Sequence, residues 1–144
     1  MFKIGVFAII FNDKKEVLLC HRRDCNIWNL PGGGLEEKES PWEGVIREVR
    51  EETGFEAKIE GLIGIYNKPQ KNEIVFCFLC SIVGGGGVLN DEANEIVFFS
   101  YSNLPENISQ KHKERIRDAF ASSNKIILKS QDSPDHFDLK KPLV

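Results

Sequence analysis

The sequence predicts an α/β (α+β) domain in which helices cover a mixed β-sheet. Two observations predict this class. Strand-like apolar runs recur along the chain, and two well-separated segments show the apolar periodicity of amphipathic helices. The length of 144 residues suits one hydrophobic core, which typically serves ~100–200 residues. We therefore expect a single domain over residues 1–144, with roughly the last twenty residues forming a polar, proline-containing tail.

The N-terminal segment predicts a β-hairpin followed by a glycine-rich turn. Residues 2–11 are rich in β-formers, residues 12–15 are a turn signal and residues 16–20 form a second strand pattern. Residues 24–29 are polar and are expected to be a loop. Residues 30–34, Leu-Pro-Gly-Gly-Gly, are expected to lie outside helices and strand ladders, because three glycines suit unusual backbone angles or close approach to a ligand.

The first helix carries start and stop signals in its sequence. Ser40 is suited to the N-cap, Pro41 to the first helical position, and Glu43 completes a capping box. Gly54 suits the residue after the helix, which should therefore end near Thr53. An apolar stripe at three- and four-residue spacing comprises Trp42, Val45, Ile46 and Val49.

The second half predicts three further strands and one helix. The strands are expected over residues 57–66, 73–83 and 95–101, with the glycines at 84–87 as a hairpin tip. Residues 109–122 predict a basic amphipathic helix, and residues 126–128 a short final strand. The basic residues of this helix, expected on its solvated face, are Lys111, Lys113, Arg115 and Arg117.

The charge is modest overall but unevenly distributed. The formal net charge is −3, yet residues 36–60 hold nine Glu and four Lys or Arg, a local −5 that leaves +2 for the remainder. This balance argues against a nucleic-acid polymer as partner, because such proteins carry a basic stripe and a pI above ~9. No run approaches the ~18 apolar residues of a membrane span, so we expect no membrane partner.

Cysteine usage favours a reducing, cytoplasmic location. Cys77 and Cys80 have the spacing of a metal or redox pair, but they lie in a strand-like run. Alternation along a strand would point them to opposite faces, so they could not easily share one metal ion. We expect all four cysteines to be reduced core residues. The N-terminus enters a strand pattern at once, so no signal peptide is expected.

Three glutamates on the first helix are the strongest chemical feature. Glu48, Glu51 and Glu52 have i, i+3 and i+4 spacing and share one helical face. Two like charges ~4 Å apart cost ~1 kcal/mol in water and ~4 kcal/mol at an effective dielectric of 20. A hard divalent cation, Mg²⁺ or Mn²⁺, would offset that repulsion. The alternative is a solvated helix face supported by Arg47 ion pairs. The upstream glycine turn favours the cation, because it brings a backbone carbonyl near the helix start.

The same residues resemble a known signature. The pattern Gly33-x5-Glu39-x7-Arg47-Glu48-Val49-x-Glu51-Glu52-x-Gly54-Phe55 is similar to the Nudix box at every fixed position. The chain thus resembles MutT-like members of the Nudix hydrolase family over roughly residues 2–122. The resemblance implies an α/β/α sandwich with a mixed central sheet. It also implies hydrolysis of a nucleoside diphosphate linked to another group X.

The resemblance implies roles for individual residues. Glu48, Glu51 and Glu52 would bind the metal, joined by the carbonyl of Gly32. Arg47 would orient those carboxylates, with Glu39 as a supporting carboxylate behind them.

We expect water to attack a phosphorus of the pyrophosphate link, with Mg²⁺ or Mn²⁺ supplying charge neutralisation. Glu51 or Glu52 is one candidate for the general base. Glu95 or Glu92, in a downstream acidic loop, is another, and the sequence does not decide between them. Of the adjacent Arg22 and Arg23, at most one should face phosphate, and Arg23 is favoured.

The group X stays open. Pro69 leans towards ADP-ribose or a nucleotide sugar, while a modified nucleoside triphosphate is a full competitor. A non-catalytic nucleotide-binding module with the same fold is the alternative function, although such a module would be expected to lose box glutamates. The expected partner is a nucleotide-type small molecule, and a homodimer is left open.

Overall fold

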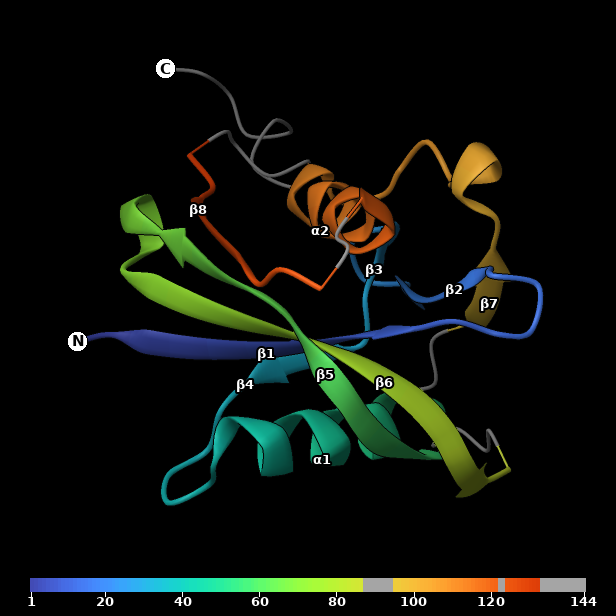
Figure 1. The fold of residues 1–144 in the computed structure, drawn as a ribbon, viewed down its shortest axis with the longest axis horizontal. Coiled ribbons are helices and arrows are strands. Elements are labelled where there is room, and N and C mark those ends of the chain that lie inside the picture. Colours follow the sequence, from blue (N-terminus) through green and yellow to red (C-terminus); the bar gives the residue numbers. More distant parts are fainter. Residues whose placement is uncertain (87–94, 122–123, 133–144) are drawn as a thin grey trace.

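The computed structural model describes residues 1–86, 95–121 and 124–132 (Figure 1). Within these residues, the strands form a five-stranded sheet of order β4-β1-β6-β5-β8 and a three-stranded sheet of order β3-β2-β7. The larger sheet comprises β1 (Lys3–Ile10), β4 (Gly32–Gly34), β5 (Phe55–Lys68), β6 (Glu73–Gly85) and β8 (Ile127–Ser130). The smaller comprises β2 (Val17–Arg22), β3 (Ile27–Asn29) and β7 (Ile96–Phe99). Because β1–β6 and β5–β8 pair in parallel while β1–β4 and β5–β6 are antiparallel, the larger sheet is mixed, as predicted.

Helices lie on both faces of the mixed sheet. Figure 1 shows α1 (Pro41–Thr53) on one side and α2 (Gln110–Ala121) on the other. Val45 and Val49 of α1 share an apolar cluster with alternate β1 residues, including Val6. Ile116 of α2 belongs to the opposite cluster, with Ile9 of β1 among others. This confirms the α/β/α arrangement that the resemblance implied.

Helix α1 begins and ends where its sequence signals predict. The Glu43 backbone N–H donates to Ser40 Oγ over 3.1 Å, and the Ser40 N–H donates back to the Glu43 carboxylate over 3.1 Å. Gly54 ends the helix with φ of 77°, a left-handed conformation that glycine adopts at little cost. One expectation was wrong: Trp42 is 59% exposed rather than part of the buried stripe.

The predicted hairpin is wrong in its pairing. β1 and β2 belong to different sheets, and the ladder expected between them is reduced to an isolated antiparallel bridge between Phe11, just after β1, and Val17. The glycine-rich turn also differs from expectation, since Gly32–Gly34 forms β4 and pairs with β1. At Gly32 an added Cβ would lie 2.2 Å from the Val6 carbonyl oxygen. Glycine is therefore needed for this close pairing, and it does not exclude a strand.

Helix α2 buries two of the basic residues that were expected in solvent. Lys111 is 4% exposed and Arg115 is fully buried, whereas Lys113 and Arg117 are exposed. The Arg115 guanidinium lies over the Phe7 ring at 5.1 Å and donates to the Gln131 side-chain oxygen. Aromatic faces and an amide oxygen thus replace water around this charge.

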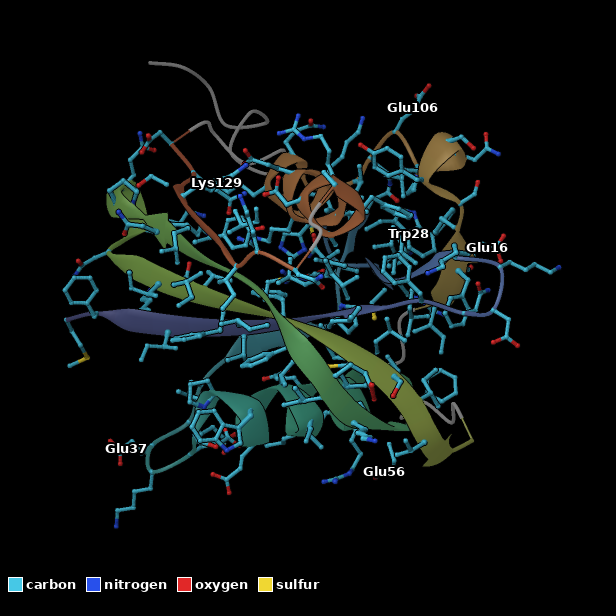
Figure 2. All side chains as sticks on the ribbon, viewed as in Figure 1. Glu16, Trp28, Glu37, Glu56, Glu106 and Lys129 are labelled. Carbon is cyan, nitrogen blue, oxygen red and sulfur yellow. The ribbon has the colours of Figure 1, made fainter. Side chains whose placement is uncertain are left out.

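The short strand predicted near residues 126–128 is confirmed as β8. It pairs in parallel with β5, and it places Lys129 beside α2 (Figure 2). Lys129 forms ion pairs with Glu114 and Asp118 of that helix. The segment from Ile127 to Gln131 therefore extends the sheet beyond β5 and contacts α2.

The strand alternation predicted for the cysteines is confirmed. Cys77 belongs to the α2-side cluster and Cys80 to the α1-side cluster, and burial raises the pKa of both thiols. In the described part of the chain, no helix is long and apolar enough to cross a membrane.

Candidate active site

Arg47 links the charged residues of the box. Its Nε and Nη2 donate to both Glu39 carboxylate oxygens, at 2.7 and 3.0 Å. Its Nη1 reaches Glu48 and Glu51, each at 3.1 Å, while Nη2 also donates to the Gly34 carbonyl at 3.1 Å. The hydrogen bonds from Arg47 to Glu39 lower the pKa of the Glu39 carboxyl group. One guanidinium therefore holds the supporting carboxylate, two candidate metal ligands and the end of β4 together.

Glu52 lies in the wall between α1 and β4. Its carboxylate accepts a 2.7 Å hydrogen bond from the Gly32 backbone N–H. Burial raises the pKa of Glu52 to about 8, and this effect outweighs the stabilising hydrogen bond. A carboxylate held this way gains from a proton or a cation, because burial penalises its charged form.

Glu48 and Glu51 differ in their surroundings although they share a helix face with Glu52. The Glu48 side chain is 14% exposed, and burial raises its pKa. It lies so close to β4 that a Cβ on Gly33 would be 2.8 Å from its carboxyl group. The Glu51 side chain is 56% exposed. The three carboxylates thus range from solvent to the interior.

The donor set fits a hard divalent cation in its chemistry, because all three side chains offer carboxylate oxygens. Across residues 1–86, 95–121 and 124–132, however, no group of three or more His, Cys, Asp or Glu side chains is gathered closely enough to hold a metal ion. The side chains instead face Arg47 and the Gly32 N–H, which offset their charge. Side-chain rotations would be needed to bring them onto one ion.

A cavity of about 340 Å³ adjoins Glu52. One wall is the β2–β3 hairpin, another is formed by Gly32 and Gly33 of β4, and α2 closes a third side. Three of its lining residues are basic and one is acidic, so its wall favours an anionic ligand. The lining comprises Phe7, Cys20, Arg22, Cys25, Ile27, Asn29, Leu30, Gly32, Gly33, Glu52, Lys68, Lys71, Ser109 and His112.

The two arginines at the end of β2 are placed differently: Arg22 is its last residue and Arg23 follows it. Arg22 lines the cavity, because strand alternation puts it on the same face of β2 as Cys20. Arg23, which the sequence favoured for phosphate, is not among the lining residues. Arg22 also pairs with the exposed Asp24 at 2.8 Å. Lys68 and Lys71, at the β5–β6 turn, were not identified from the sequence, where two lysines flanking a Pro-Gln pair carry no specific signal.

Glu95, one of the two downstream carboxylates considered as a base, does not line the cavity. The Glu95 side chain is 63% exposed and lies 3.8 Å from the Nδ1 atom of His21. His21 points to the face of β2 opposite Cys20 and Arg22. Glu92 falls outside the described residues. Pro69 begins a short 3-10 helix (Pro69–Lys71) that follows the lining residue Lys68 and ends at the lining residue Lys71.

The model of the NUDIX domain family matches residues 1–119. The chain belongs to the Nudix family. Nudix enzymes are hydrolases that generally use divalent metal ions. As a member of this family, the chain is a Nudix hydrolase.

Individual relatives span most of this chain. A Bacillus subtilis (strain 168) protein, provisionally named an 8-oxo-dGTP diphosphatase, is 34% identical over 119 residues, covering 82% of this chain and 80% of its own. The ADP-ribose pyrophosphatase of Methanocaldococcus jannaschii is 33% identical over 121 residues, covering 80% and 71%. Among solved structures, a UDP-X diphosphatase superposes with a TM-score of 0.79 at 30% identity, covering 90% of this chain and 67% of that one.

Proposed function

We propose that this Nudix hydrolase cleaves the pyrophosphate link of a nucleoside diphosphate bonded to another group X. The observation that carries the proposal is the Glu52 carboxylate, which meets Gly32 in the wall of a cavity that Arg22 also lines. A buried acid beside basic residues suits a site that takes a cation together with a polyphosphate.

Glu48, Glu51 and Glu52, with the Gly32 carbonyl, would hold Mg²⁺ or Mn²⁺. When bound, such an ion neutralises charge on the phosphoryl oxygens and lowers the pKa of water. Arg47 positions the carboxylates through the bonds described above. We assign Arg47 no contact with the substrate, because its guanidinium already donates hydrogen bonds to Glu39 and to the Gly34 carbonyl.

The chemical step is attack of water on phosphorus. A new bond forms between the water oxygen and phosphorus, and a water proton passes to a carboxylate. The bond from that phosphorus to the bridging oxygen breaks, and the leaving phosphate departs with this oxygen and the bonding electron pair. We assign Glu52 as the general base, with Glu51 as its alternative on the same helix face. The position of Glu95 beside His21 gives no support to the role expected from the sequence. Arg22 would orient the phosphate chain.

The names of the relatives support two candidate classes of substrate. Names of ADP-ribose pyrophosphatase and UDP-X diphosphatase favour a nucleoside diphosphate linked to a sugar-like group. The Bacillus subtilis relative favours a modified nucleoside triphosphate as the second candidate. A non-catalytic binding module is less well supported, because the chain keeps all the glutamates of the box.

A substrate panel tests this function. Purified protein would be incubated with ADP-ribose, a UDP-sugar, 8-oxo-dGTP or dGTP, with Mg²⁺, with Mn²⁺ or with EDTA. Chromatography of the products should show a nucleoside monophosphate from at least one compound, in the metal-containing samples alone. Absence of turnover for the whole panel, or turnover unchanged by EDTA, would contradict the proposal.

A further inference from the structure

His112 is a buried residue in the cavity wall whose role the reaction does not require. It lies one turn into α2 and is 6% exposed. Its Nδ1 atom accepts a 2.9 Å hydrogen bond from the backbone N–H of Leu30. The imidazole ring meets the Phe7 ring edge-on, at 4.7 Å between centroids and 77° between planes. One hydrogen bond and one ring contact therefore fix the orientation of the imidazole.

The Leu30 contact also fixes the proton of the imidazole. A neutral imidazole has one donor and one acceptor nitrogen, and an Nδ1 that accepts leaves the proton on Nε2. Burial keeps the pKa of His112 well below its usual range, and the nearby charges of Arg115, Lys68 and Lys111 add to this effect. The ring therefore presents an uncharged Nε2–H group.

Within the described residues, the hydrogen bond of the imidazole to Leu30 uses Nδ1 and so leaves Nε2–H available to a ligand. This donor belongs to a cavity-lining residue, next to apolar lining from Phe7, Ile27 and Leu30. A ligand acceptor at this point would gain a hydrogen bond to a donor whose orientation is already fixed by the Leu30 bond and the Phe7 contact. Lys68, the nearest lining cation on the β5–β6 side, is already paired with Glu73 at 3.0 Å.

The size and lining of the cavity limit what the acceptor can belong to. About 340 Å³ is at the small end of the ~300–1,000 Å³ typical of ligand pockets. It suits one compact group of the substrate rather than a complete dinucleotide. The uncharged Nε2–H donor beside the apolar side chains of Phe7, Ile27 and Leu30 suits a planar, uncharged group with acceptor atoms.

We propose that His112 is a specificity-determining residue whose Nε2–H donates a hydrogen bond to a ring nitrogen or carbonyl oxygen of the substrate's nucleobase. The proposal rests on the proposed function for the presence of a nucleotide. It assigns His112 no part in proton transfer, since the group that it would contact does not react.

Nuclear magnetic resonance of ¹⁵N-histidine-labelled protein tests the hydrogen bond without requiring turnover. AMP, GMP and UMP would be titrated in EDTA, with ribose 5-phosphate and inorganic phosphate as matched probes. We expect at least one nucleotide to slow exchange of the His112 Nε2 proton and shift its resonance, and the two base-free probes to leave it unchanged. An equal response to a base-free probe, or no response to any nucleotide, would overturn the proposal.

Two variants separate substrate reading from a structural role. His112→Asn keeps an oxygen that can accept the Leu30 N–H, but its amide nitrogen does not extend to the Nε2 position, whereas His112→Gln carries a donor near that position. For the preferred panel substrate, we expect His112→Asn to raise KM about three- to tenfold, with kcat little changed. His112→Gln should recover part of the loss. Equal KM values for His112→Asn and the wild-type protein would overturn the proposal, whereas inactivity of the wild-type protein would count against the proposed function alone.

Discussion

The Gly32 backbone N–H and the Glu52 carboxylate form a 2.7 Å hydrogen bond that joins β4 to α1 across twenty residues of sequence. This bond places the most buried carboxylate of the box against the glycine strand that lines the cavity. The glycine strand and the glutamate helix therefore act as one unit, and substitutions in either should change the same site.

Gly33→Ala should reduce activity without unfolding the protein. The added Cβ would lie 2.8 Å from the Glu48 carboxyl group, which is the flexible end of a side chain and can move aside. We expect kcat/KM to fall about tenfold or more, because displaced reactive-site groups commonly cost that much. Gly34→Ala is the matched control, since nothing lies within 4 Å of its Cβ. Equal steady-state rates for the two variants would contradict this account.

Arg47→Lys should weaken metal activation. Lysine cannot reproduce the planar fork that reaches Glu39, Glu48 and Glu51 together. Loss of such orienting partners typically costs about 10–100-fold in metal affinity or activity. The expected result is a corresponding rise in the Mg²⁺ concentration that gives half-maximal rate.

Arg50→Lys serves as the control for that experiment, because Arg50 lies on the same helix and pairs with the exposed Glu56. Its magnesium titration should match that of the wild-type protein. If Arg47→Lys and Arg50→Lys gave the same titration curve, the orienting role of Arg47 would be wrong.

Local sequence signals predicted the structure best where a few neighbouring residues decide it. The capping box at Ser40 and the left-handed Gly54 set the ends of α1. The spacing of Glu48, Glu51 and Glu52 placed them on one face. Strand partners were harder, because the pairing of β1 with β4 and β6 depends on segments far apart in sequence. The positions of Lys68 and His112 in the cavity wall were equally hard to predict, because they too depend on contacts between segments far apart in sequence.

Gln131→Leu should destabilise the fold, although residue 131 lies beyond the span that the family model matches. The Gln131 amide accepts two bonds from the buried Arg115 guanidinium and donates to the Lys111 carbonyl. Removing these partners from buried polar groups should lower the free energy of unfolding by about 2–4 kcal/mol.

Urea denaturation would measure that loss, with Ser130→Ala as control. Ser130 has an exposed side chain that contacts Asn67 at 3.3 Å, so its removal should change stability little. A midpoint for Gln131→Leu that coincides with the control would show that the C-terminal segment does not support α2.

The buried basic residues of α2 show why charge patterns alone mislead. The sequence predicted that Lys111 and Arg115 are exposed to solvent. It does not reveal that β8 and Gln131, which follow the helix in sequence, pack against it. A tertiary partner supplied by a segment after the helix thus reversed the exposure expected from composition.

His112 should make stability depend on pH below neutrality. Its pKa is held well below its usual value in the folded protein, whereas in the unfolded chain it is ~6.5. As the pH falls below ~6.5, His112 therefore becomes protonated in the unfolded chain but stays neutral in the folded protein. The free energy of unfolding should drop by up to about 1.4 kcal/mol per pH unit there.

Comparison with His112→Asn isolates this contribution. Urea titrations between pH 7 and pH 5 would give the free energy of unfolding of both proteins, and the wild-type slope should be the steeper. Parallel slopes would mean that His112 gains a proton equally in the folded and unfolded states.

The most direct test of the central claim is kcat/KM of Glu52→Gln, measured with saturating Mg²⁺ on the preferred panel substrate. Glu56→Gln is the control, because Glu56 is a solvent-exposed carboxylate in β5, just past the end of α1, that pairs with Arg50. The account predicts a loss of about a hundredfold or more for Glu52→Gln and a value close to wild type for Glu56→Gln. Equal turnover by wild-type protein and Glu52→Gln would contradict it.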